Sequence, residues 1–160
     1  MTMSTQDEEK KDQMATDDKW IDEIHQKRKS QRDAADATTR ERLEKEQIFE
    51  TKLPALWAAL DHELRRVVDV YNAQAGDAQV SVGTESPEYQ FNATAPARLG
   101  YAAPTLRVQL QPGQRRLVAQ SLGNTYTYDL ILDQGEIVVR GYDLKAVAKR
   151  ILHPFFENIA

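Results

Sequence analysis

Apolar residues recur with two different periods in residues 51–160. In "LPALWAALDHELRRVVDVYNAQAG", residues 53–76, they follow the i, i+3, i+4, i+7 spacing of a helix that buries one side. Pro54 suits the first turn of such a helix. Because the residue before a proline avoids the helical region, we expect a break or kink near Leu53.

From Gln79 onward the period changes to two, which predicts β-strands. The turn-forming sequences QPGQ, LGNT and DQGE lie between the later strands and predict hairpins. We expect strands near residues 79–84, 88–94, 104–111, 115–121, 126–132 and 136–141.

Two-residue loops would fix the register of these hairpins. We place the loops at Pro112-Gly113, Gly123-Asn124 and Gln134-Gly135. They put Val108 opposite Leu117, and Leu117 opposite Leu130, so that all three turns send apolar residues to one side of the sheet. Pro-Gly is less usual than Asn-Gly in so short a hairpin, and a longer first loop is the alternative.

The last segment, "DLKAVAKRILHPFFENIA", is again helical in pattern, and Asp143 is a fair N-cap. Its polar side carries Lys145, Lys149 and Arg150, which is ordinary for the outer side of an amphipathic helix. Pro154 should kink or end the helix about a turn earlier. We therefore predict an α+β fold, an antiparallel β-meander of five to six strands with two amphipathic helices packed on one face.

A long polar N-terminal helix and a disordered tail are expected to precede this domain. Residues 1–16 are too polar to offset the entropy of ordering. Residues 17–50, called the arm below, contain neither Gly nor Pro, and large apolar residues occur only near its two ends. Either the arm is a solvated helix with pairs such as Arg40–Glu44, or it frays at residues 37–39. The expected divisions are thus 1–16, 17–50 and 51–160.

The apolar residues of the arm suggest an interaction role. We call the apolar tip the three residues Trp20, Ile21 and Ile24. The apolar tip lies beyond a long polar stretch, which suggests that it contacts another molecule. Near the other end, we expect Leu43, Ile48 and Phe49 to root the arm in the domain. The hypothesis that follows is a non-enzymatic adaptor or assembly subunit whose partner is a second copy or a different protein.

The same register predicts a mixed outer face of the sheet, away from the helices. There we expect Val118, Ile131 and Val138 to lie near one another with charged residues around them. This is either an ordinary solvated face or a second docking surface. Its candidate partner-binding residues are Arg107, Arg116, Val118, Asp129, Ile131, Val138 and Arg140.

Charge and composition exclude several classes of function. Residues 1–50 contain 14 Asp/Glu and 10 Lys/Arg, whereas residues 51–160 contain 11 of each. A domain without net charge has no electrostatic field that would attract nucleic acid or an anionic membrane, so neither is an expected partner. The chain has no cysteine, which removes disulfides and thiolate sites and fits the cytoplasm. The acidic start does not resemble a signal peptide.

No motif indicates an enzyme, and we expect no catalytic residue, metal or cofactor. His25, His62 and His153 lack neighbours suited to a metal ion, and no P-loop or nucleophile motif is present. The alternative function is a small-molecule or lipid-binding domain with a cavity between helices and sheet. Such a cavity would be lined by Trp57, Tyr71, Tyr128, Phe155 and Phe156.

Overall fold

The structure, a computed structural model, describes residues 18–84 and 87–159. The tail expected at residues 1–16 lies outside the described residues. The chain divides into two compact units, Met1–Glu44 and Lys45–Ala160.

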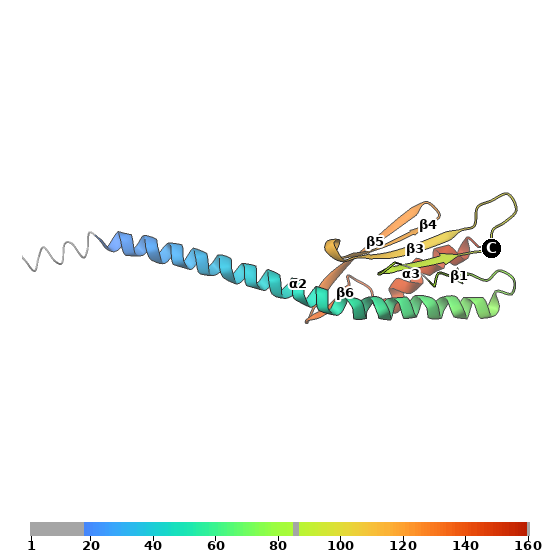
Figure 1. Ribbon diagram of the computed structural model, residues 1–160, viewed down its shortest axis with the longest axis horizontal. Coiled ribbons are helices and arrows are strands. Elements are labelled where there is room, and N and C mark those ends of the chain that lie inside the picture. The colour runs from blue at the N-terminus through green and yellow to red at the C-terminus, as the bar shows by residue number, and fades with distance from the viewer. Residues whose placement is uncertain (1–17, 85–86, 160) are drawn as a thin grey trace, which may run out of the picture. The chain divides into compact units, whose positions relative to one another are not determined.

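One helix, α2 (Lys19–Gln74), contributes to both units and is drawn from blue to green in Figure 1. In the first unit its side chains are exposed from Lys19 through Glu44. The helix continues through residues 37–39, so the expectation of fraying there is wrong; the sequence offers good helix formers and neither Gly nor Pro.

Of the break or kink expected near Leu53, the break is wrong, because α2 continues past Pro54. A proline removes one backbone donor and crowds the preceding turn. Here the Pro54 side chain is exposed, while Phe49 and Leu53 before it and Leu60 after it are buried in the core. Packing on both sides of the proline therefore holds the helix together.

The sheet confirms the predicted antiparallel meander, with the strands paired in chain order from β1 to β6. With α2 and the C-terminal helix it forms the predicted α+β fold. β1 is shorter than expected, since only two residues pair with β2. The strands are β1 (Ser81–Val82), β2 (Gln90–Thr94), β3 (Thr105–Gln111), β4 (Arg116–Ser121), β5 (Asn124–Asp133) and β6 (Glu136–Val139).

The register of the β3–β4 hairpin differs from the prediction by two residues. Val108 pairs with Ala119 rather than with Leu117. The connection is longer than two residues, because Pro112–Gln114 forms a short 3-10 turn, η1, and Arg115 adopts a left-handed conformation with φ of 49°. The longer-loop alternative is therefore the correct one.

The β4–β5 register is likewise shifted by two residues, so that Leu117 pairs with Tyr128 rather than with Leu130. The turn is Leu122-Gly123, one position earlier than expected, with φ values of 53° and 79°. Two consecutive positive φ angles are typical of a type I′ hairpin turn. Only the β5–β6 hairpin has the predicted register, with Leu132 opposite Ile137.

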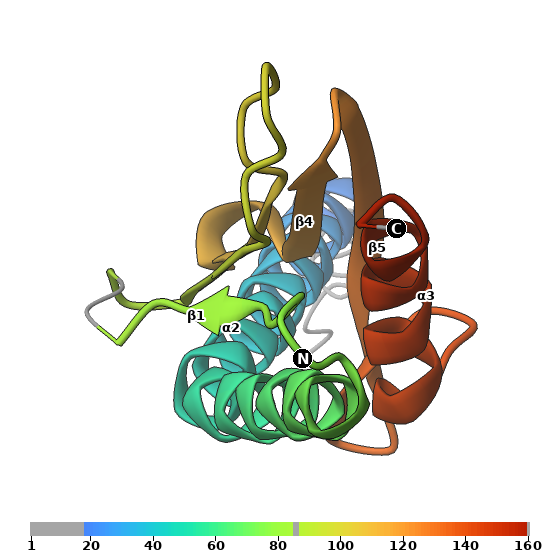
Figure 2. The same cartoon turned by 90° about the vertical axis from the view of Figure 1, so that its right-hand side faces the viewer.

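The core lies between the concave side of the sheet and two helices. The second helix, α3 (Leu144–Glu157), lies beside the C-terminal part of α2, and the strands curve around the pair (Figure 2). Side chains from both helices and from all strands except β1 are buried there, including Leu64, Phe91, Leu106, Leu152 and Phe155.

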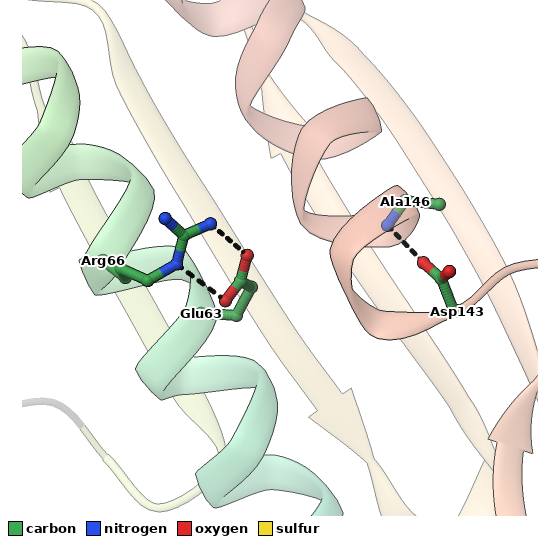
Figure 3. A network of polar contacts seen from close by, with 4 residues as sticks. All are labelled: Glu63, Arg66, Asp143 and Ala146. Atoms are coloured by element: carbon green, nitrogen blue, oxygen red, sulfur yellow. Dashed lines mark hydrogen bonds and ion pairs between the residues drawn. The ribbon is translucent and has the colours of Figure 1, made fainter.

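Of the two predictions made for the ends of α3, one is confirmed and one is wrong. The Ala146 backbone N–H donates to Asp143 Oδ1 at 2.7 Å, so Asp143 is the N-cap as predicted (Figure 3). Pro154 does not end the helix a turn earlier, since α3 continues to Glu157. Phe155 directly after the proline is completely buried, and this packing favours continuation of the helix.

Candidate functional site

The apolar tip lies at the start of α2 and is exposed. Trp20 exposes 58%, Ile21 37% and Ile24 40% of the reference surface. At about 100° per residue, the three side chains share one side of the helix. Fully burying such a side chain is worth roughly 1.5–3 kcal/mol, so exposing three together is costly for a free surface.

Within residues 19–50, the part of the arm that lies in α2, charges are distributed unevenly between the two halves, whereas residues 17–34, with Asp17 and Asp18 included, have no net charge. Residues 19–34 contain five Lys/Arg and three Asp/Glu, whereas residues 35–50 contain three Lys/Arg and five Asp/Glu. The small residues Ala34, Ala35 and Ala37 lie near the middle of this stretch. Residues 19–50 of α2 therefore combine an apolar tip, small central side chains and two halves of opposite net charge.

The contacts that were expected to anchor the arm in the domain are only partly present. Phe49 is buried in the core of the second unit, and the Arg115 guanidinium lies 4.2 Å from the centroid of its ring. Ile48 is half-buried. Leu43 exposes 52% of its surface, so the expectation that it anchors the arm is wrong; it lies before the start of the second unit at Lys45.

The outer sheet face has the predicted residues but not the predicted apolar centre. Ile131 pairs with Val138 across β5 and β6. Val118 instead pairs with Gln109 and Thr127, which is four residues along β5 from Ile131. Because of the two-residue register shift, the expected cluster of three apolar residues is wrong. Val118 is moreover only 8% exposed, so it offers little surface to a partner.

The charged residues of the outer face lie on four strands or at their ends. Arg116 pairs directly with Asp129 across β4 and β5, and its Nε donates to Gln111 Oε1 at 2.7 Å. The Arg140 backbone N–H donates to the Asp129 carbonyl at 2.9 Å. Arg107 is exposed on β3. Charged and polar groups thus cover most of this face.

Most of the aromatic residues considered for a ligand cavity pack on one another or in the core. Tyr71 stacks on Phe156 with centroids 4.2 Å apart. Trp57 packs against Tyr89, and Phe155 is fully buried. Of the five expected residues, Tyr128 and Phe156 each line one of the grooves described below.

Tyr128 lies in an open groove of about 580 Å³ between β5 and α3. We call it the basic groove, because three of its seven lining residues are basic and none is acidic. Burial raises the pKa of the Tyr128 phenol above its usual value. The lining residues are Tyr126, Tyr128, Ala146, Lys149, Arg150, His153 and Pro154.

Sequence reasoning missed the basic groove. Lys149 and Arg150 read as the solvated side of an amphipathic helix. The available signal was the alternation of β5, which puts Tyr126 and Tyr128 on the same side of the sheet as Leu130. That side continues beyond the buried core toward the polar residues of α3.

A second groove, of about 370 Å³, lies between α2 and α3 and shares Lys149 and His153 with the basic groove. It also contains Arg66, whose guanidinium donates to both carboxylate oxygens of Glu63 at 2.6 and 3.0 Å (Figure 3). This ion pair lowers the pKa of Glu63, mainly through the hydrogen bond from Arg66. The charge of Arg66 is therefore already balanced within the protein.

One buried polar group has no partner in the described part of the chain. Ser121 is 8% exposed, and its hydroxyl oxygen forms no hydrogen bond there. It lines a polar groove of about 280 Å³ at the β4–β5 turn with Asn124 and Thr125. No histidine or carboxylate lines that groove, so it does not provide a base for the serine.

Within residues 18–84 and 87–159, no three His, Asp or Glu side chains are grouped closely enough to hold a metal ion. No helix in these ranges has an apolar stretch long enough to cross a membrane. Comparison with protein families, with curated proteins and with solved structures finds no match to this chain.

Proposed function

We propose that the chain is a non-enzymatic assembly subunit that pairs with a second copy of itself through the arm, with the two helices antiparallel. The observation that carries this proposal is the exposed apolar tip on a helix whose two halves have opposite net charge. The partner is thus a protein of the same sequence.

The apolar tip favours association because Trp20, Ile21 and Ile24 are large, close together and exposed. Six such side chains, three from each copy, contribute on the order of 10 kcal/mol if fully buried. This is comparable with the entropic cost of bringing two proteins together, roughly 4–15 kcal/mol. Burial of the two tips, each against the other copy's arm, therefore needs help from the rest of the helix.

The charges supply that help in one orientation only. Antiparallel pairing brings the half with two excess positive charges against the half with two excess negative charges, twice in each dimer. Parallel pairing would bring like against like. Complementary charges select orientation and speed the encounter, even where they add little affinity.

The spacing of apolar and small residues agrees with antiparallel pairing. If two arms cross at Ala34 and Ala35, Ile21 of one copy lies opposite Ile48 of the other, and the tip lies near the exposed Leu43. Small side chains at the crossing point allow the two backbones to approach closely. The outer sheet face is not needed, because Val118 there is nearly buried.

Sedimentation velocity over a concentration series tests the proposal. The chain should shift from monomer to dimer as its concentration rises, and the double variant Ile21→Asp/Ile24→Asp should remain monomeric. Val70→Asp is the matched control, since Val70 is a 51% exposed residue of the same helix in the second unit. A native chain that stays monomeric, or loss of the dimer in the control alone, contradicts the proposal.

Cysteine cross-linking tests the orientation, and the absence of native cysteine makes the result unambiguous. In antiparallel helices crossing near Ala34, residue 27 of one copy lies opposite residue 42 of the other. A mixture of Lys27→Cys and Arg42→Cys chains should form a mixed disulfide dimer on oxidation. Efficient cross-linking of Lys27→Cys chains to each other would instead indicate parallel pairing.

A further inference from the structure

The basic groove between β5 and α3 presents cationic groups that lack partners of opposite charge. Within the part of the chain that the structure describes, Lys149 and Arg150 form no ion pair. His153 Nε2 lies 3.4 Å from Glu157 Oε1, so this imidazole has one carboxylate nearby. Two full positive charges therefore remain available at the groove.

Arg150 is held in place by an aromatic ring rather than by an anion. Its guanidinium carbon lies 4.4 Å from the centroid of Tyr142. The Tyr142 ring in turn packs perpendicular to Tyr128, with centroids 6.0 Å apart. A ring stacked on one face of a guanidinium leaves the in-plane N–H donors unoccupied, and these donors match the geometry of a carboxylate or phosphate.

The opposite wall of the groove is aromatic. Tyr126 and Tyr128 are two residues apart on β5 and therefore point to the same side of the sheet. Each provides an apolar ring and a phenolic O–H donor. A tyrosine phenol is protonated at neutral pH, and burial raises the pKa of Tyr128 further. From α3, Ala146 and Pro154 add apolar surface to the groove.

The neighbouring groove between α2 and α3 lacks this chemistry. There Glu63 accepts hydrogen bonds from Nε and Nη2 of Arg66 (Figure 3), and a carboxylate next to an entering anion would repel it. The basic groove contains no carboxylate among its lining residues, and its volume of about 580 Å³ lies within the usual range of small-molecule sites.

We propose that the basic groove binds a small organic anion that carries a phosphate or carboxylate group on an aromatic body. Lys149 and Arg150 bind the oxyanion, and the rings of Tyr126 and Tyr128 contact the aromatic part. The site is formed by β5 and α3 alone, so this proposal does not depend on pairing of the arm.

Nuclear magnetic resonance titration with phenyl phosphate tests the proposal on the full chain. Backbone signals of Tyr126, Ala146, Lys149 and Arg150 should shift and saturate. Inorganic phosphate and phenol serve as comparison probes, and each should bind at least about tenfold more weakly, because each supplies only half of the recognised chemistry. Equal affinity for phenyl phosphate and inorganic phosphate would overturn the aromatic part of the proposal.

Charge-removing variants locate the site. Lys149→Gln/Arg150→Gln should weaken phenyl phosphate binding about tenfold or more, because charge-assisted hydrogen bonds are lost. Arg140→Gln is the matched control, since Arg140 is an exposed arginine on the outer face of the sheet. The absence of saturable shifts in the native protein, or equal weakening in the Arg140→Gln control, would overturn the proposal. Circular dichroism establishes that the variants retain the native fold.

Discussion

Asn72 and Val80 are joined by two hydrogen bonds between a side-chain amide and a backbone. The Val80 N–H donates to Asn72 Oδ1 at 2.7 Å, and Asn72 Nδ2 donates to the Val80 carbonyl at 2.9 Å. Asn72 lies near the end of α2, and Val80 directly precedes β1. The amide thus fixes how the chain leaves the helix and enters the sheet.

Replacement of Asn72 by Ala should destabilise the protein by about 1–3 kcal/mol, because the Val80 backbone groups lose their partners in a partly buried position. Urea unfolding measures the free energy. Gln74→Ala is the control, since Gln74 is an exposed residue in the same turn of the helix and should cost much less. Equal losses in the two variants would contradict the role assigned to Asn72.

Asp143→Ala should lower the free energy of unfolding by about 1 kcal/mol, because the Ala146 N–H loses its N-cap acceptor. Asp143→Asn keeps a side-chain oxygen at the same position and should retain most of the stability. Thermal unfolding of the three proteins checks the order. A loss as large in Asp143→Asn as in Asp143→Ala would show that the acceptor oxygen does not stabilise the helix.

Pro54→Ala should stabilise the protein by about 1–3 kcal/mol, since alanine restores a backbone donor in the interior of α2 and removes a steric clash. Pro96→Ala is the control. Pro96 lies in an exposed loop, where losing a proline frees the unfolded chain and should be neutral or slightly destabilising. Denaturant unfolding of both variants makes the comparison, and a destabilised Pro54→Ala variant would indicate that the proline is needed at this site.

Because of the Glu63–Arg66 ion pair, we expect the free energy of unfolding to depend on pH in the acid range. Because its hydrogen bond to Arg66 lowers the Glu63 pKa in the folded protein, the pair stabilises the fold at pH values above the unfolded pKa. That contribution is lost as the pH falls through the folded pKa. As the pH is lowered from about 6 to about 3, the free energy of unfolding should therefore fall less for Glu63→Gln than for the native protein.

Two measurements check this prediction. Arg66→Gln should raise the Glu63 pKa, as followed by carbon-13 resonance of the carboxyl group, because its main hydrogen-bond donor is gone. Glu88→Gln, in an exposed loop, should unfold with the same acid dependence as the native protein. An unchanged Glu63 pKa in Arg66→Gln would contradict the assigned cause.

The sequence pattern predicted the elements and the faces of the strands more accurately than the register. Apolar alternation decides which side of a strand is buried, and a shift by two residues leaves that side unchanged. This is why Leu117 is buried as expected, although it pairs with Tyr128 instead of Leu130. The register itself depends on loop conformation.

Two of the three expected loops were placed wrongly, and each of these contains a residue other than glycine with a positive φ angle. Arg115 has φ of 49° and Leu122 has φ of 53°. Because such conformations are uncommon outside glycine, asparagine and aspartate, no rule based on residue type would place Leu122 in the turn in preference to Asn124. Gln134-Gly135 has the same conformation, with φ values of 51° and 77°, but there the expected loop already placed the glycine second, and the register is correct.

The candidate sites depend on tertiary contacts in different degrees. Trp20, Ile21 and Ile24 are neighbours along one helix, so their grouping followed from sequence alone. The basic groove brings Tyr126 on β5 next to Lys149 on α3, and only the packing of the helix on the sheet creates that proximity.

The two strands at the margins of the sheet bear on how this chain avoids aggregation. β1 has only two residues, and β6 has four, with Lys52 Nζ donating to Glu136 Oε1 and to the Gly135 carbonyl where β6 begins. Short, tethered edge strands offer few unpaired backbone groups to another polypeptide. Fibril-like growth by addition of strands is therefore disfavoured at both margins of the sheet.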